Sequence, residues 1–311
     1  MHIINNNKAD WKIIVREVIF EGVATALVTP FLHDSYIDYK SYEGIIEQQL
    51  SAGVKALVVA GTTGEAATLT DAEHYEIIRF VVNTVAGRVP VIAGAGSNDS
   101  EHGRRMCKSA MRAGADALLL VTPYYNKCNE KGLYEHYRKC SSGADDSLPI
   151  IIYNVPSRTG VNIKLSCYER LIAIENIVAV KEASGNLAQV ADIVANYGDE
   201  ISVYSGSDEL IVPILSLGGR GVISVVSHVI PSEMVQICTD YMEGKTERSR
   251  NRMLHYMELM KAMFMDINPL PVKKAMSLMG YCLGECRLPL GTMEEADEMK
   301  LKKMMEKYHI I

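Results

Sequence analysis

The sequence lacks the features of a membrane, secreted or nucleic-acid-binding protein. It has no apolar run near the roughly 18 residues that a membrane-spanning helix needs. Residues 1–18 mix Asn, Lys, Asp, Arg and Glu and contain no apolar stretch of a secretory signal. No long basic run occurs, and the formal net charge is -6 at pH 7, which argues against a phosphate-backbone partner. We therefore expect a cytoplasmic protein that neither spans a membrane nor binds nucleic acid.

The cysteines show neither disulfide-type nor zinc-type spacing. The seven cysteines are scattered and odd in number, which indicates free thiols in a reducing compartment. Cys282 and Cys286 are close in sequence, but no second Cys or His pair follows to complete a tetrahedral metal site. Gly94-Ala95-Gly96 begins like a dinucleotide-binding loop, but Asp99 stands where the third glycine is required. These patterns favour neither a metal site nor a dinucleotide site.

Length and composition are those of an ordinary globular protein. The chain has 311 residues, of which 48% are hydrophobic and 23% are charged, so it can bury a substantial core. Its length fits about two domains of ordinary size. It fits equally well one α/β barrel of about 250 residues with an appendage.

Short runs rich in Val, Ile, Leu and Ala recur along the chain and predict eight β-strands. Each run is followed by a polar turn and then by a segment with helical spacing. For example, Asp71 begins a segment whose apolar residues stand at 77, 78, 81 and 82. The predicted strands cover residues 22–28, 56–59, 90–93, 117–121, 150–153, 177–180, 201–204 and 221–224.

The repeated strand–helix unit predicts a TIM barrel. Strands that are almost continuously apolar are typical of a parallel sheet with helices on both faces. Eight such units favour a (β/α)8 barrel of the α/β class, although an open doubly wound sheet has the same local pattern. We predict an N-terminal extension over residues 1–18, a catalytic barrel over 19–245 and a C-terminal helical appendage over 246–311.

Lys181 is the strongest candidate for a reactive residue. In a barrel of this class, functional side chains gather where the strands end, and Lys181 follows the apolar run 177–180. Loss of hydration lowers a lysine pKa toward about 7 to 8 and leaves a neutral amine, which can form an imine with a carbonyl substrate. The alternative is a lysine that extends to solvent or pairs with Glu182.

Hydroxyl groups stand at neighbouring strand ends. Tyr153 ends the preceding predicted strand, and its phenol can deliver or remove protons during imine formation. Thr62 and Tyr125 offer further hydroxyls at two other strand ends. A single tyrosine at such a position is usually a packing residue, so the grouping of the three is what predicts a proton relay.

Two further features suit carboxylate groups. The turn Gly61-Thr62-Thr63-Gly64 offers free backbone N–H groups and the Thr63 hydroxyl. Arg158 precedes the turn residue Gly160 and can form a bidentate bond to a second carboxylate. An ordinary surface ion pair is the alternative for Arg158.

From about Phe20 to Leu290, the sequence resembles the dihydrodipicolinate synthase family of the pyruvate-dependent aldolase superfamily. Several long motifs occur in the right order, which makes the resemblance specific. These motifs are Gly61-Thr-Thr-Gly-Glu65, Val121-Thr-Pro-Tyr-Tyr-Asn126, Tyr153-Asn-Val-Pro-Ser-Arg-Thr-Gly160, Lys181-Glu-Ala-Ser-Gly-Asn-Leu187 and Gly221-Val-Ile-Ser-Val225.

The resemblance implies an enzyme of lysine and diaminopimelate biosynthesis. In this family, pyruvate condenses with L-aspartate 4-semialdehyde through a Schiff base, for which Lys181 is the matching lysine. Tyr153 then matches the proton donor and acceptor, in a relay with Thr62 and Tyr125. The family places the equivalent of Tyr125 across a tight dimer interface.

The resemblance also implies substrate contacts and an assembly. Thr63 and Ile223 match pyruvate-binding positions, and Gly206 matches a residue that lines the site. Arg158 matches the residue that holds the semialdehyde carboxylate. No metal or organic cofactor is implied, and the expected assembly is a homotetramer, a dimer of dimers, or a homodimer.

Two alternative functions are compatible with the residues alone. One is another pyruvate-dependent lyase, of the sialic-acid or keto-deoxy-sugar type. Sialic-acid lyases usually carry Ser in the first motif and lack the arginine, so Gly61-Thr62-Thr63 and Arg158 favour the synthase. The other is a non-catalytic keto-acid-binding protein, which the full set of candidate catalytic residues argues against.

Feedback inhibition by lysine uses a pocket at the dimer interface in this family, and this sequence matches its pattern only in part. The positions that agree with the sensitive pattern are Ala67, His74, Asn98 and Tyr124. Ala66 replaces Ser, Asp71 replaces His, and His102 replaces Glu. Because the missing acid would pair with the ligand ammonium, we expect weak inhibition by lysine.

Overall fold

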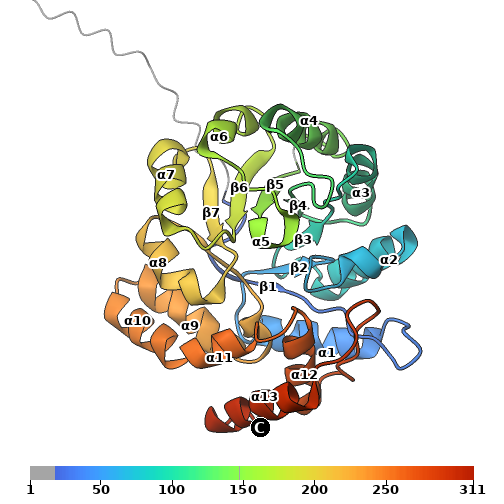
Figure 1. The fold of residues 1–311 in the computed structure, drawn as a ribbon, viewed down its shortest axis with the longest axis vertical. Helices are drawn as coiled ribbons and strands as arrows, with labels where there is room; N and C mark the ends of the chain where they lie inside the picture. The colour runs from blue at the N-terminus through green and yellow to red at the C-terminus, as the bar shows by residue number, and fades with distance from the viewer. Residues whose placement is uncertain (1–17, 147) are drawn as a thin grey trace, which may run out of the picture.

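The chain folds into a closed barrel of eight parallel strands surrounded by helices. The computed structural model describes residues 18–146 and 148–311, and within them the strands pair in chain order until β8 pairs with β1 (Figure 1). The strands are β1 (Gly22–Ala26), β2 (Ala56–Val59), β3 (Val91–Gly94), β4 (Ala117–Val121), β5 (Ile150–Asn154), β6 (Ile177–Glu182), β7 (Ser202–Ser205) and β8 (Gly221–Ser224). The predicted TIM barrel is confirmed, and the open sheet is excluded.

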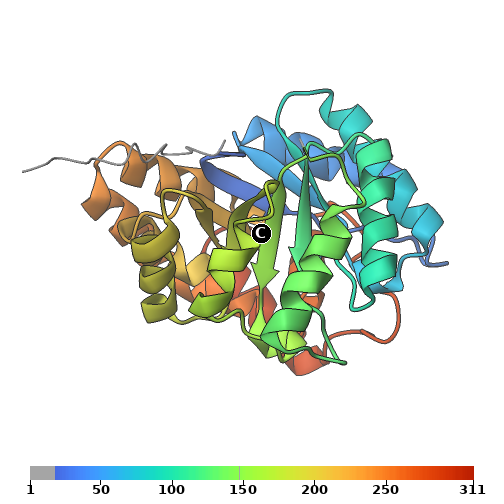
Figure 2. The same ribbon diagram turned by 90° about the horizontal axis from the view of Figure 1, so that it is seen from above.

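Helices connect the strands, and most of them form a ring outside the barrel (Figure 1, Figure 2). The helices up to the last barrel unit are α1 (Tyr39–Ser51), α2 (Asp71–Val85), α3 (Ser100–Arg112), α4 (Glu130–Ser141), α5 (Pro156–Thr159), α6 (Leu165–Leu171), α7 (Leu187–Tyr197), α8 (Ile211–Ser216) and α9 (Pro231–Met242). Short 3-10 turns follow three of the strands: η1 (Ala66–Thr68), η2 (Asp208–Leu210) and η3 (Val226–His228).

Helix α2 shows how the local sequence sets these elements. It begins at Asp71, as predicted, because the Thr70 hydroxyl accepts from the Glu73 N–H and the Glu73 carboxylate accepts from the Thr70 N–H. This reciprocal capping box satisfies N–H groups that a helix start leaves without partners. Ile77 and Val81 are buried on the face toward the strands.

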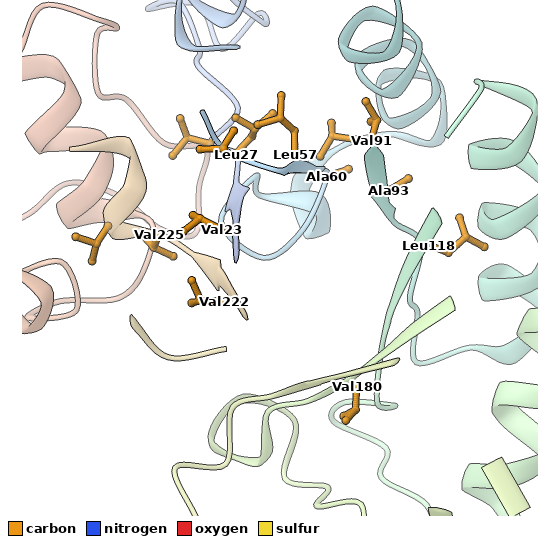
Figure 3. Packing of buried hydrophobic residues seen from close by; sticks show 14 of the residues in the cluster. Val23, Leu27, Leu57, Ala60, Val91, Ala93, Leu118, Val180, Val222 and Val225 are labelled. Atoms are coloured by element: carbon orange, nitrogen blue, oxygen red, sulfur yellow. The ribbon is translucent and has the colours of Figure 1, made fainter. Parts of the chain in front are cut away.

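The strands bury side chains on both of their faces. In β2, Ala56 and Val58 belong to a cluster with residues from all eight strands, so they fill the barrel interior. Leu57 and Val59 alternate with them and belong to the layer between strands and helices. Figure 3 shows part of this outer layer, including Leu57 and Leu118. Near-continuous apolar strands therefore match a parallel barrel covered by helices.

Strand β6 contains one extra residue that sets the direction of its end. Ile177 pairs with Ile150, but Ala179 pairs with the next residue, Ile151, so the register shifts at Val178. Val178 and Ala179 both belong to the interior cluster. A bulge of this kind changes which face the following side chains occupy. Lys181 is thereby in register with Tyr153, which belongs to the interior cluster.

Several strand ends differ from the prediction by one or two residues, and those of β5 and β6 bear on Lys181. We expected β6 to end at residue 180 and β5 at residue 153, but the strands continue to Glu182 and Asn154. The ladder continues because Lys181 pairs with Tyr153 and Glu182 pairs with Asn154. Lys181 is therefore held by a strand, where we had expected it to follow one.

The last part of the chain is helical. It forms α10 (Thr246–His255), α11 (Met257–Ala262), α12 (Leu270–Leu278) and α13 (Glu295–Lys307). Helix α10 packs on α9, and α13 packs on α11 and α12 (Figure 1). The division between residues 245 and 246 stays a prediction, and residues 1–17 of the expected extension lie outside the described residues. No described helix combines the length and the apolar character needed to cross a membrane.

A buried ion pair joins the C-terminal helices to the loop after β2. The Nζ of Lys273, in α12, donates to the Glu65 Oε1 at 2.6 Å and to the Thr29 carbonyl at 2.8 Å. Neither side chain of the pair is exposed to solvent. The second Glu65 oxygen accepts from the backbone N–H of Arg287 at 2.9 Å. The loop that carries Thr62 and Thr63 is therefore held in place by the end of the chain.

The first prediction concerns the stability that this pair provides. Replacing Glu65 with Gln removes the charge that neutralises the buried Lys273 ammonium, so we expect unfolding in urea to require about 3–5 kcal/mol less free energy. The matched control is Glu258→Gln, which breaks an exposed pair with Lys307 and should change the stability by less than about 1 kcal/mol. A similar small loss in both variants would contradict the prediction.

Candidate active site

The predicted site residues gather around a cavity at the carboxyl ends of the strands. The cavity has a volume of about 580 Å³ and is lined by Thr62, Thr63, Tyr153, Arg158 and Gly206, among others. A second cavity of about 440 Å³ adjoins it, and Thr62, Tyr153 and Arg158 line both cavities. This is the end of the barrel at which function was expected.

Lys181 lies deep in the barrel end. It is 6% exposed, and its Nζ lies 4.3 Å from the centroid of the Tyr153 ring. Burial lowers the pKa of Lys181 to about 8, against the opposing effect of the Asp208 carboxylate, while the nearby Arg158 cation adds to the lowering. A substantial fraction of the amine is therefore neutral near physiological pH. The alternative of a lysine that extends to solvent is wrong.

The neighbouring acid, Glu182, is occupied by other groups. Its Oε2 accepts from the Asn154 side chain at 2.9 Å, and its Oε1 accepts from the Ser184 backbone N–H at 2.7 Å. This carboxylate ties the end of β6 to β5 and to the following loop. Pairing with Glu182 was the second alternative for Lys181, and the contacts of the carboxylate give it a structural role instead.

Tyr153 is a protonated phenol beside the lysine. Burial raises the pKa of Tyr153 to about 12, and the Arg158 cation and a hydrogen bond with the Thr62 side chain moderate the rise. The phenol therefore carries its proton at neutral pH and can donate it. Thr62 is exposed on the cavity side of the loop, so two of the three predicted relay hydroxyls are together.

Tyr125, the third predicted relay residue, is apart from them. Its side chain is 91% exposed, and its backbone has a φ of 67°, a left-handed conformation that is uncommon for a residue other than glycine. It is not among the residues that line either cavity, whereas its neighbour Tyr124 lines the second cavity. Within one chain, the predicted relay is therefore incomplete.

Asn268 is a site residue that the sequence reasoning missed. Its Nδ2 donates to the Thr63 hydroxyl at 3.0 Å, and its backbone carbonyl accepts from Nη2 of Arg158 at 3.1 Å. Asn268 is buried and lines both cavities. We had expected the segment around it to belong to a C-terminal helical appendage. The Asn-Pro pair at 268–269 was the one available signal, and nothing local to it indicated the barrel end.

Gly206 and Ile223 complete the surroundings of the lysine. A Cβ atom at position 206 would lie 2.6 Å from the Ala183 Cβ and 3.2 Å from the Lys181 Cε, so glycine leaves room for the lysine side chain. Ile223 is buried in β8, where it pairs with Ala24 and belongs to the interior cluster. Within the described residues, no three His, Cys, Asp or Glu side chains are grouped so that they could hold a metal ion.

Comparison with known proteins decides the family. The sequence model of the Dihydrodipicolinate synthetase family matches residues 19–308. The chain belongs to this family. The curated 4-hydroxy-tetrahydrodipicolinate synthase of Caldicellulosiruptor bescii is 46% identical over 292 residues, which are 94% of this chain and 98% of the relative.

Solved structures of the family have the same fold. Dihydrodipicolinate synthase from Aquifex aeolicus matches with a TM-score of 0.91 at 41% identity and covers 94% of this chain and 99% of its own. A structure described as the first monomeric dihydrodipicolinate synthase variant matches with a TM-score of 0.91 at 40% identity, over 94% of this chain and 98% of its own. The expected family is confirmed, and the chain is an enzyme of the lyase class.

Proposed function

We propose that this chain condenses pyruvate with L-aspartate 4-semialdehyde through an imine on Lys181. It has the 4-hydroxy-tetrahydrodipicolinate synthase activity of its family, in the biosynthesis of diaminopimelate and lysine. The observation that carries the residue assignment is the buried Lys181 amine, with a pKa of about 8, beside a cavity open to small substrates. A neutral, desolvated amine is the nucleophile that imine formation requires.

The proposed reaction uses each group in turn. The neutral Nζ attacks the C2 carbonyl of pyruvate, and the resulting hydroxyl leaves as water once it has received a proton from the Tyr153 phenol. Transfer of a proton from C3 to the Tyr153 phenolate restores the phenol and converts the imine into an enamine. C3 then attacks the aldehyde carbon, and the amine of the semialdehyde displaces Lys181 as the ring closes. Tyr153 suits these steps because its phenol stays protonated between transfers.

The remaining cavity residues position the two substrates. Thr63 and the β8 residue Ile223 hold pyruvate, and Gly206 keeps space for it beside Lys181. Arg158 binds the semialdehyde carboxylate, because its guanidinium lines both cavities and uses Nη2 to contact the Asn268 carbonyl. Several of its N–H groups thus stay available for a bidentate bond.

We further propose that Tyr125 completes the relay of a second copy of the chain, in a homodimer or a homotetramer. Support comes from its exposure in the single chain and from its positive φ, a costly conformation for an exposed tyrosine without a partner. We place the enzyme in the reducing cytoplasm, which the free cysteines support.

The second prediction tests the imine directly. Borohydride added with pyruvate should attach a three-carbon label to Lys181, and the initial rate of labelling should rise with pH through about 8 as the ammonium loses its proton. Mass spectrometry of peptides identifies the labelled lysine. Lys273 is the internal control, because it is equally buried but is paired with Glu65 and should stay unlabelled. No label on Lys181 would refute the mechanism and favour a non-catalytic keto-acid-binding protein.

The third prediction concerns Arg158. In Arg158→Ala, the KM for L-aspartate 4-semialdehyde should rise at least about tenfold while the KM for pyruvate changes little, because a charge-assisted bidentate contact is lost for one substrate only. Arg158→Lys is the matched control, since it keeps the charge but loses the bidentate geometry, and should lie between the two. Steady-state kinetics with each substrate varied in turn provide the measurement, and equal changes in both KM values would remove the assignment.

The cavity that corresponds to the expected lysine pocket has an acid at position 71 and a histidine at position 102, where the acid was expected. The second cavity is lined by Asp71, His74, His102 and Tyr124. His102 Nε2 lies 3.0 Å from the Asp71 carboxylate. Glu101 is also engaged, by Arg104 at 2.6 Å and Lys139 at 3.0 Å.

The fourth prediction is that millimolar L-lysine inhibits this enzyme weakly or not at all. A ligand ammonium would find His102 where an acid is needed, and the loss of one charge-assisted hydrogen bond costs about 1.5–3 kcal/mol, or roughly ten-fold to a hundred-fold in affinity. The variant His102→Glu should be more sensitive than the parent in an inhibition curve at saturating pyruvate. Half-inhibition of the parent at sub-millimolar lysine would prove the prediction wrong and identify Asp71 as the substitute acid.

A further inference from the structure

The residues after β7 bring a second buried acid, Asp208, close to Lys181, in addition to Glu182. The backbone N–H of Gly206 donates to the Glu182 carbonyl at 2.8 Å, which brings the chain back past the end of β6. Asp208 begins η2 two residues later and lines the same cavity as Tyr153 and Thr63. Its side chain belongs to a residue that is only 3% exposed. The sequence analysis did not single out Asp208.

The two oxygens of the Asp208 carboxylate differ in their hydrogen bonds. Its Oδ2 accepts from the backbone N–H groups of Val225 and Val226, at 3.0 and 3.1 Å, and the Ser224 hydroxyl also hydrogen-bonds to the carboxyl group. Its Oδ1 is buried and has no hydrogen-bond partner. A buried carboxylate oxygen without a partner is costly. Such an oxygen, on a residue that lines a ligand cavity, is available to a cation that forms there during the reaction.

We propose that Asp208 is the buried counter-ion for the positive charge that the Lys181 nitrogen acquires when the imine forms. This proposal rests on the imine proposed above. Before the reaction the amine must be neutral, but the protonated imine is a cation on a buried nitrogen. An oriented carboxylate that is already desolvated stabilises such a cation without rearrangement. Asp208 is a positioning and electrostatic residue, distinct from the proton donor Tyr153.

Two other acids, Glu209 and Asp266, line the same cavity, but neither is among the charged groups that shift the pKa of Lys181. Tyr153, on β5, is a neutral phenol at physiological pH, and Arg158, beyond it, is a cation that opposes any positive charge on Lys181. The Glu182 carboxylate is engaged by Asn154 and the Ser184 backbone. On the α9 side, the Cys238 thiol interacts with Asp208, and burial raises the pKa of this thiol so that it stays neutral.

The ionisation of Asp208 follows from the same contacts. Burial raises the pKa of Asp208, while its hydrogen bonds from Ser224, Val226 and Val225 and the nearby Lys181 oppose the rise. A permanent cation on the lysine nitrogen favours the ionised carboxylate further. The imine cation and the aspartate anion therefore stabilise each other.

The variant Asp208→Asn removes the negative charge at position 208 and keeps the shape of the side chain. Its amide oxygen can still accept from Val225 and Val226, and its amide nitrogen takes the place of the unpartnered oxygen. Two changes are expected because the anion is gone. The Lys181 amine should lose its proton at lower pH, so the pH midpoint of pyruvate–borohydride labelling moves below that of the parent. The fraction of protein present as imine at saturating pyruvate should fall at least about tenfold, from the loss of one charge interaction at an effective dielectric constant of about 20.

Two control variants keep the charge of Asp208. Ser224→Ala removes one hydrogen bond from the carboxyl group, and it should leave the pH midpoint in place. Asp240→Asn neutralises another buried acid, on α9, which pairs with Arg248 and Arg252, and should lower the stability without moving the midpoint. Asp208→Ser provides a second neutral variant whose hydroxyl can accept from one N–H group, and a circular-dichroism melt of each variant establishes that it is folded.

The outcomes distinguish this inference from the proposed function. If the parent enzyme forms no imine, the proposed function fails at the first step. If the parent forms the imine and a folded neutral variant at position 208 keeps both the midpoint and the imine fraction, the counter-ion proposal is overturned. An equal midpoint shift in Ser224→Ala or Asp240→Asn would also overturn it, because the effect would then come from general loosening of the barrel end.

Discussion

The chemistry proposed for this enzyme depends on the removal of water from one amine. Lys181 lies near the end of strand β6, in a closed barrel whose interior is filled mainly by apolar side chains from all eight strands. In that environment the charged form is destabilised, so the pKa of the lysine falls to about 8. The strands must be apolar on both faces to form a parallel barrel at all. The property that specifies the fold therefore also produces the nucleophile.

The groups around the amine limit what a buried, reactive lysine would otherwise do. Glu182, the nearest acid in sequence, is kept from pairing with it by Asn154 and Ser184. Tyr153 contributes a proton and a ring face but no charge. Asp208, which acts on the lysine from the loop after β7, is anchored through its Oδ2 to the backbone after β8. An oriented anion is therefore in place for the cation that the proposed reaction forms.

The parts of this site that could be predicted are those coded by local sequence. The eight strands were recognisable because each is a short apolar run between polar turns, and Lys181 and Tyr153 stood out as polar residues at the ends of such runs. The extra residues of β5 and β6 were missed because their pairing comes from the partner strand. Asn268 could not be placed, since it meets Thr63 across 205 positions of sequence. Contacts of this kind depend on how whole surfaces dock, which no short pattern contains.

The extra residue in β6 gives the active site a dependence on residue count. Because Val178 and Ala179 both face inward, every side chain after them has the opposite facing from the one that a regular strand would give it. Removal of one of these two residues would restore regular alternation and leave Lys181 facing inward, whereas one residue inserted between Ala179 and Lys181 would turn Lys181 toward the helices. Point substitutions here change packing, whereas such an insertion would exchange the side chains of the pocket and of the outer layer. The number of residues between the bulge and Lys181 therefore decides which side chain enters the pocket.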